Sequence, residues 1–166
     1  MALFRRKGCI VGAGSVLLLS SLVLFWLLWP DVEDLIAAST RNDASMINIC
    51  LICGVDVNGK EKWGWYRKHD GRTPLTAAVQ RGSVSTISRL IQAGAGVNFP
   101  NGFGERPAWT AAVRGEIEII TLLSEQGADF SVIYLKKSTV EIAIAAGHTK
   151  AAEEIQKILA AKAGNI

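Results

Sequence analysis

Among the three cysteines and two histidines of this chain, those outside the long apolar segment that contains Cys9 are the candidates for redox, metal or acid–base chemistry. Cys50 and Cys53 form a Cys-x-x-Cys pair in CLIC, a spacing that suits a disulfide or half of a metal site. No second ligand pair accompanies them, which argues against a metal. His69 has only Asp70 as an acidic neighbour, and no Ser or Cys is recognisably paired with a base. We therefore expect no enzyme activity, no catalytic residue, no metal and no cofactor.

A second group of residues suits molecular recognition. The stretch GKEKWGWYRKHDG, residues 59–71, places aromatic and basic side chains between two glycines. Trp, Tyr and Arg most often carry interface energy, whereas a basic, Trp-rich loop also suits anionic lipid headgroups. A third alternative is that the aromatic side chains fold back over the protein's own first repeat. The residues concerned, with the arginine that follows, are Trp63, Trp65, Tyr66, Arg67, Lys68 and Arg72.

The elements that must position these residues follow a long apolar segment. Residues 9–29, CIVGAGSVLLLSSLVLFWLLW, carry no charge and as a helix would span the roughly 30 Å hydrocarbon core of a bilayer. Arg5, Arg6 and Lys7 precede them and acidic residues follow, so the positive-inside rule places residues 1–8 in the cytoplasm. The apolar run is longer than a usual signal-peptide core, which favours an uncleaved signal anchor over a cleaved leader. We expect the rest of the chain to lie in a bacterial periplasm or another extracytoplasmic space.

Glycine spacing and net charge indicate whether the chain should bind a second copy of itself or nucleic acid. Gly8 and Gly12 form a Gly-x-x-x-Gly pair near the cytoplasmic end of the span, which allows weak self-association. The basic residues before the span account for the whole net charge of +3, so the part beyond it is neutral. A neutral domain has no general reason to bind nucleic acid, and we expect none to bind.

After the apolar segment the chain repeats itself with a period of 33 residues. RTPLTAAVQRGSVSTISRLIQAGAGVN, from Arg72, aligns without gaps to ERPAWTAAVRGEIEIITLLSEQGADFS, from Glu105. A further copy begins at Lys137 and a degenerate one at Val32. Each contains two short segments of helical apolar periodicity separated by a tight turn, which predicts a pair of antiparallel helices. One pair cannot bury its apolar face alone, so we expect the pairs to stack.

These copies resemble the ankyrin repeat. The matching motifs are TPLTAA, AAVRGE and AIAAGH, and the closures GVDVN, GAGVN and GADFS. The resemblance implies an all-α solenoid of about four helix-turn-helix repeats, preceded here by the single transmembrane helix. We expect the repeat domain to cover residues 32–162, with repeats at about 32–58, 71–98, 104–131 and 137–162 and an extended hairpin insert at 59–70.

The repeat register also bears on the candidate chemistry. It aligns Cys50 with buried leucines and puts Cys53 at a variable helical position before the closing glycine, so we expect neither a disulfide nor a metal site there. His148 occupies the Gly-His turn of the family pattern, which implies a structural role. Arg106 stands where a threonine should cap the helix, and the loop FSVIYLKKS lacks the usual glycine.

In the ankyrin family, hairpin tips and first helices line the concave face where partners bind. The resemblance therefore places residues 59–71 as a finger at that face. Trp109 on a first helix is expected either to pack between repeats or to meet a ligand. The helical residues expected on this face are Ala77, Arg81, Trp109, Thr110 and Arg114.

The sequence thus predicts a membrane-tethered ankyrin repeat module that binds a protein partner on the non-cytoplasmic side. The concave face and the finger would make the contact. Two alternatives stay open. One is an immunity or inhibitor protein whose finger blocks a toxin or an exported enzyme, and the other is a membrane assembly or scaffold protein.

Overall fold

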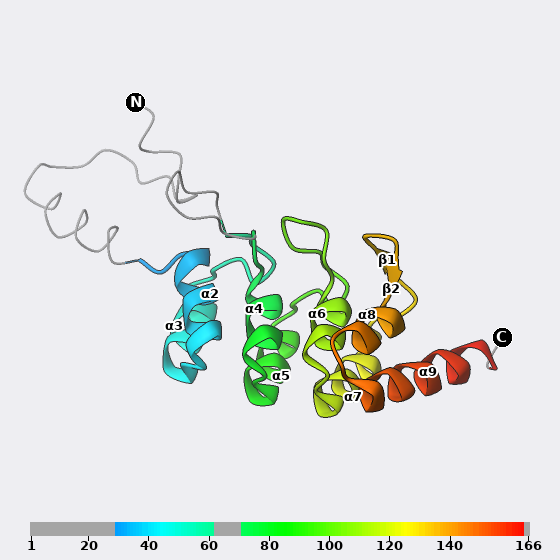
Figure 1. Ribbon diagram of the computed structural model, residues 1–166. Helices are drawn as coiled ribbons and strands as arrows, with labels where there is room; N and C mark the ends of the chain where they lie inside the picture. The colour runs from blue at the N-terminus through cyan, green and yellow to red at the C-terminus, as the bar shows by residue number, and fades with distance from the viewer. Residues whose placement is uncertain (1–28, 62–70, 165–166) are drawn as a thin grey trace, which may run out of the picture.

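The computed structural model describes residues 29–61 and 71–164, in which four helix pairs stack in one row (Figure 1). The pairs are α2 (Val32–Arg41) with α3 (Ala44–Ile52), α4 (Pro74–Arg81) with α5 (Val84–Gln92), α6 (Pro107–Arg114) with α7 (Ile117–Glu125), and α8 (Thr139–Ala145) with α9 (Thr149–Ala163). An antiparallel ribbon of β1 (Ile133–Tyr134) and β2 (Lys137–Ser138) joins the last two pairs. The predicted helical repeats are confirmed for the described part of the chain.

The membrane span and most of the aromatic insert fall outside this description. Within residues 29–61 and 71–164, no helix is both long and apolar enough to cross a bilayer. The span expected at residues 9–29 lies outside them except for Trp29, as do the expected cytoplasmic arm and its Gly8 and Gly12. Five of the candidate partner residues also lie outside: Trp63, Trp65, Tyr66, Arg67 and Lys68.

The core lies between neighbouring pairs. The first helices pack in the order α2, α4, α6 and α8, and the second helices cover them. In α6, Ala108, Ala111 and Ala112 are fully buried, because small side chains let adjacent first helices approach closely. Large aliphatic residues from the second helices, such as Leu90 and Leu123, complete the layers. Each pair therefore buries its apolar face only against the next pair.

The two ends of the stack differ. Helix α9 buries Ala151, Ala152 and Ile155 and keeps most of its charged residues exposed, which suits the terminal helix of a stack. Helix α3, at the other end, leaves Ile49 and Ile52 exposed, with no preceding repeat to cover them in the described chain.

Capping side chains explain where several helices begin. Thr73 accepts a hydrogen bond from the backbone N–H of Thr76, whose hydroxyl accepts one from the backbone N–H of Thr73, and Pro74 follows. Ser138 and Glu141 form the same reciprocal box at the start of α8. Arg106 begins α6 without any side-chain cap, as the sequence predicts.

Asparagine side chains link each closing turn to the next. Asn58 accepts a hydrogen bond from the N–H of Gly96 at 2.7 Å and donates one to the carbonyl of Gly94 at 3.2 Å. One repeat later, Asn98 bonds the N–H of Asp129 at 2.8 Å and the carbonyl of Gly127 at 3.1 Å. We call these two asparagines the clamps. They satisfy backbone groups at the ends of the second helices and set the spacing of the repeats.

Removing a clamp should lower stability measurably. We expect Asn58→Ala to reduce the free energy of unfolding by about 1–2 kcal/mol, because two inter-repeat hydrogen bonds are lost. Urea unfolding followed by circular dichroism measures this.

Ser131 is the matched control, since it occupies the clamp register of the third repeat but bonds Asp129 of its own turn. Ser131→Ala should change the free energy by less than about 0.5 kcal/mol. Equal losses in the two variants would show that the clamp adds nothing specific.

The capping difference makes a second stability prediction. Thr73→Ala should lower the free energy of unfolding by about 1 kcal/mol, because the cap of α4 is lost. Arg106→Ala at the same register removes no cap, and its pair with Asp129 is long, 3.4 Å, and exposed, so we expect little change. Urea unfolding of both variants tests this, and a larger loss for Arg106→Ala would contradict it.

Candidate partner-binding surface

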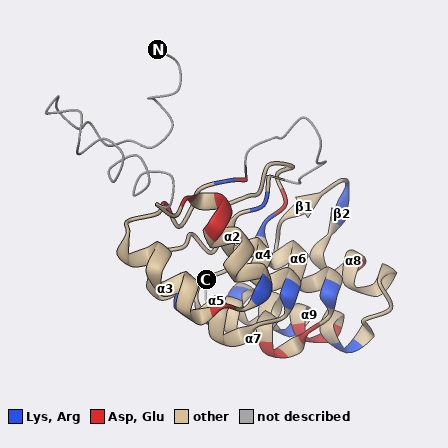
Figure 2. Cartoon of the chain, turned by 90° about the vertical axis from the view of Figure 1, so that its left-hand side faces the viewer, with Lys and Arg blue, Asp and Glu red and all other residues tan. Residues whose placement is uncertain are grey.

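A basic row follows the ends of the first helices. Arg41, Arg81 and Arg114 are the last residues of α2, α4 and α6 and all three are exposed. Each is followed by a left-handed residue, Asn42 or a glycine, which ends the helix. Figure 2 shows basic segments side by side at the C-terminal ends of the first helices. A cation also suits the negative end of a helix, so the row is compatible with the helices that carry it.

Only part of this row is neutralised. Arg114 donates from Nε to Glu116 at 2.8 Å, which pairs its charge. Arg41 and Arg81 make no ion pair within residues 29–61 and 71–164. Their guanidinium groups therefore remain available to carboxylates of a partner.

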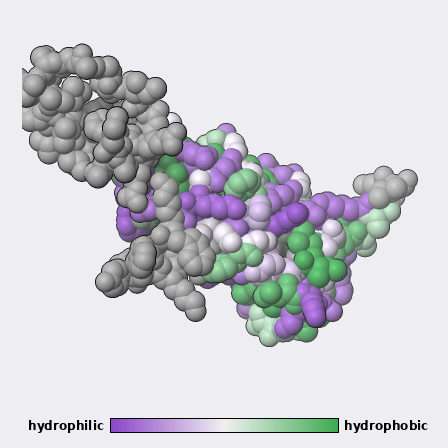
Figure 3. All heavy atoms as spheres, turned by 90° about the horizontal axis from the view of Figure 1, so that it is seen from above, coloured by the Kyte–Doolittle hydropathy of each residue, from purple (hydrophilic) through white to green (hydrophobic). Residues whose placement is uncertain are grey.

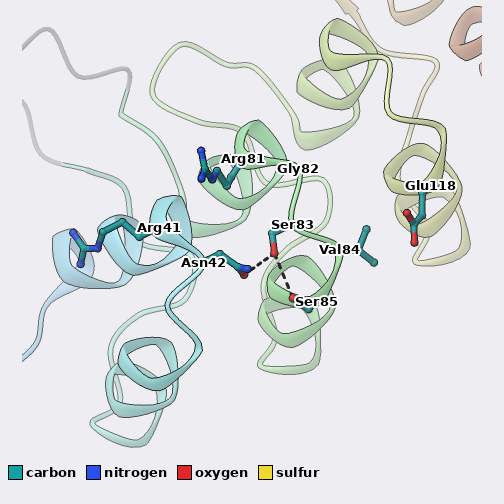
Figure 4. A pocket seen from close by; sticks show the side chains of 8 residues that line it. All are labelled: Arg41, Asn42, Arg81, Gly82, Ser83, Val84, Ser85 and Glu118. Atoms are coloured by element: carbon teal, nitrogen blue, oxygen red, sulfur yellow. Dashed lines mark hydrogen bonds between the residues drawn. The ribbon is translucent and has the colours of Figure 1, made fainter.

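An open cleft of about 530 Å³ lies beside these two arginines. Ser83, Ser85 and Glu118 line it from the second and third repeats (Figure 4). The hydroxyl of Ser83 donates to the side-chain oxygen of Asn42 at 2.6 Å, so the cleft bridges two repeats. Its walls are polar, which favours a polar peptide segment over an apolar ligand.

Three of the predicted helical contacts are buried. Trp109 packs edge-on against Tyr134, with ring centroids 5.1 Å apart and planes at 72°, and is 6% exposed. Of the two expected alternatives for Trp109, the structure has packing between repeats. Ala77 and Thr110 are 1% and 6% exposed. Their roles in partner binding stay predictions, and burial leaves their side chains little surface for such contact.

Arg72 lies at the base of the aromatic insert, which we call finger 1 (residues 59–71). Its Nε contacts a carboxylate oxygen of Glu61 at 3.2 Å, and its carbonyl accepts from the N–H of Glu61 at 2.9 Å. These bonds join the two sides of the finger at its base. Most of the Arg72 side chain is thereby committed within the protein.

Finger 1 is joined to the next inter-repeat loop, residues 99–105, which we call finger 2. The N–H of Gly102 donates to the carbonyl of Gly71 at 2.8 Å. A Cβ atom on Gly71, whose φ is +54°, would lie 2.7 Å from the Cα of Gly102, so only glycine permits this approach. Lys60 lies 5.1 Å from the ring centre of Phe99 and donates to the carbonyl of Asn101.

Finger 3, residues 131–138, contains the β1–β2 ribbon and contacts finger 2. The hydroxyl of Tyr134 donates to the carbonyl of Phe103 at 3.0 Å. Within finger 2, the Asn101 side chain accepts from the N–H groups of Phe103 and Glu105, both at 2.9 Å. Side-chain and backbone bonds thus join the described base of finger 1 to finger 2, and finger 2 to finger 3.

The cysteines and His148 have structural surroundings. Cys50 is fully buried, and burial raises the pKa of its thiol to about 11. Both Cys50 and Cys53 are free thiols, and no cluster of three metal-ligating side chains occurs within the described ranges. Cys53 is the C-cap residue that follows α3 and does not lie within the helix, which corrects its expected helical position. His148 begins α9 and its ring lies against Gly115, as expected of a turn residue.

Sequence reasoning missed several exposed residues. Arg41 was not recognised as a member of the basic row because its repeat is degenerate. Aligning its Arg41-Asn42 turn with the Arg-Gly turns of the next two repeats would have identified it. Phe103, Ile133 and Leu135 are exposed on fingers 2 and 3, where hydrophobic residues without a helical period gave no signal.

Comparison with known proteins identifies the repeats. Residues 35–134 match a family model described as ankyrin repeats, three copies. The chain belongs to the ankyrin repeat family. Ankyrin repeats are protein–protein interaction modules and are typically not enzymes. The match ends at Tyr134, so the fourth ankyrin-like pair, α8 with α9, is seen in the structure beyond the matched residues.

One curated relative is BRCA1-associated RING domain protein 1 of Caenorhabditis elegans. It is 30% identical to this ankyrin repeat chain over 111 residues, which are 66% of this chain and 15% of the relative. The chain therefore spans a small part of that protein's length, and the similarity supports the repeats rather than the activity of the whole relative.

The thiols give a chemical test of the non-redox interpretation. On the folded protein at pH 8 we expect iodoacetamide to modify Cys50 at least about a hundredfold more slowly than the partly exposed Cys53, because a raised pKa and burial leave little accessible thiolate. Peptide mass mapping over time measures both rates. Unfolding in guanidinium should equalise them. Two thiols that react only after reduction would instead indicate a disulfide.

Proposed function

We propose that this ankyrin repeat protein is a membrane-tethered module that binds a protein partner on the non-cytoplasmic side. The partner lies along the C-terminal ends of the first helices, where the basic row is, and extends to finger 1. The observation that carries the proposal is the pair of exposed arginines, Arg41 and Arg81, which border an open polar cleft without an ion-pair partner among the described residues. Family membership supports a protein as the ligand.

Rigidity favours binding at this surface. The clamps fix the spacing of the repeats, and the Arg72–Glu61 pair with the Gly71–Gly102 bond fixes the base of finger 1. A preformed surface loses little conformational entropy when a partner docks. An acidic segment in the partner would complement Arg41 and Arg81, and such charge matching contributes mainly to specificity and association rate.

The tether rests on the sequence. Residues 9–29 have the length and hydropathy of a transmembrane helix, and the basic residues before them favour a cytoplasmic N-terminus. An anchor of this kind raises the effective concentration of the module for targets at the same membrane. The repeats then face the periplasm or an equivalent extracytoplasmic space.

Capture from native membranes and from the exported fraction tests the partner surface. We expect full-length protein to retain a specific partner that two variants lose by about tenfold or more: Trp63→Ala/Trp65→Ala/Tyr66→Ala and Arg41→Glu/Arg81→Glu. Lys157→Glu is the matched charge control, because the Lys157 side chain is 73% exposed on the last helix, away from the cleft. Circular dichroism must show that all variants remain folded.

The outcomes distinguish the alternatives for finger 1. Unchanged capture by both variants would contradict the proposed surface. Unfolding of the triple aromatic variant would show that those side chains cover the first repeat. Protease added to cells whose outer membrane alone has been permeabilised should cleave the repeats. Protection of the repeats would contradict the proposed topology.

A further inference from the structure

We propose that the tips of fingers 2 and 3 rest on the outer surface of the same membrane that holds the anchor. Phe103, Ile133 and Leu135 would enter the headgroup region, with Lys136 and Lys137 meeting lipid phosphates. This inference rests on the membrane tether proposed above and adds a second, peripheral lipid contact. Its consequence is a repeat domain held in one orientation on the bilayer by a second contact besides its short connection to the span.

The first observation is apolar exposure at the tips. Phe103 is 43% exposed, Ile133 71% and Leu135 74%. Figure 3, which looks down on this edge, shows hydrophobic atoms gathered on the side of the β1–β2 ribbon. Single exposed apolar residues are ordinary, but several on adjoining loop tips mark a contact surface.

The backbone of finger 3 is the second observation. Leu135 and Lys136 both have positive φ, +50° and +62°, at the two positions between β1 and β2. Two-residue hairpins of this kind prefer Asn-Gly or Asp-Gly, because other side chains are strained there. Leu135 gains little burial within the described protein in exchange for that strain. A leucine held outward in this way indicates a contact beyond the chain itself.

The tips are held firmly. Tyr134 packs on the buried Trp109 and donates to the carbonyl of Phe103, so fingers 2 and 3 are fastened to each other and to α6. The apolar side chains therefore project from a fixed edge of the stack. A rigid edge can align with a planar surface without losing the entropy of loop ordering.

Chain length brings the bilayer to this edge. The first helices all run from the finger side toward the short turns, so the chain enters α2 at the finger side (Figure 1). Only Pro30 and Asp31 separate the end of the expected span, Trp29, from the start of α2 at Val32. Two residues reach at most about 7 Å, so the membrane surface must pass close to the beginning of α2.

Charge selects which part of the edge makes the contact. Lys136 and Lys137 are exposed beside Leu135 and suit anionic headgroups. Asp31, Glu33 and Asp34 stand at the start of α2, where they would be repelled by the same lipids. Contact through the tips of fingers 2 and 3 combines apolar insertion with the basic pair, a combination typical of interfacial binding.

Site-specific photocrosslinking on the full chain tests this contact. The photoreactive residue benzoylphenylalanine replaces Leu135 or Ile133 in protein reconstituted into vesicles of phosphatidylethanolamine and phosphatidylglycerol. Ile117 is the matched control, because it is 42% exposed but begins α7 at the opposite, short-turn end of the stack. We expect about tenfold more lipid adduct from positions 133 and 135 than from position 117.

A hairpin variant separates lipid contact from folding. L135N/K136G supplies the residues that the turn prefers, so its stability to urea should be retained or increased. Lipid adducts from a probe at Ile133 should nevertheless fall severalfold, because the neighbouring apolar and basic side chains are gone.

Each other result has a distinct meaning. In one outcome the protein stays bound to the vesicles while probes at 133 and 135 give no more lipid adduct than the probe at 117. That result overturns the lipid contact and leaves the tether intact. Adducts between two copies of the chain at these positions also overturn it, in favour of self-association. Protein washed from the vesicles by carbonate refutes the tether and this inference with it.

Discussion

Dependence of each helix pair on its neighbour is the constraint from which the rest of this structure follows. A pair such as α4 with α5 has its apolar residues on faces that only adjacent repeats cover. The clamps Asn58 and Asn98 add directional bonds at the closing turns, where backbone groups of the second helices would otherwise lack partners. Nonpolar burial holds the repeats together, and the clamps fix their register.

A fixed register turns isolated side chains into surfaces. Arg41, Arg81 and Arg114 are distant in sequence but form a row, because each ends a first helix at the same height. The inter-repeat loops are aligned by the same spacing, and the hydrogen bond from Tyr134 to Phe103 joins two of them. One edge of the stack therefore carries polar and basic helix ends, and the other carries fingers with apolar tips.

The two proposed contacts use different parts of these edges. The protein partner contacts the basic row and extends to finger 1 on the finger edge, which leaves the tips of fingers 2 and 3 to the lipid surface. Trp109 serves the lipid contact indirectly, since its buried ring packs against Tyr134 and so supports the position of finger 3. Burial rather than exposure is then the contribution of this tryptophan, and that is a tertiary property which its place on a first helix did not reveal.

The sequence by itself determined the helix pairs, their 33-residue period and several helix ends, because caps such as Thr73 and stops such as Gly82 act through local hydrogen bonds and backbone angles. It also determined the structural role of Cys50, whose register matches buried leucines. Only the tertiary structure decided that Trp109 is buried, that Arg72 is bound to Glu61 and that Leu135 projects outward. These outcomes depend on contacts between loops and repeats far apart in the chain, which no local pattern records.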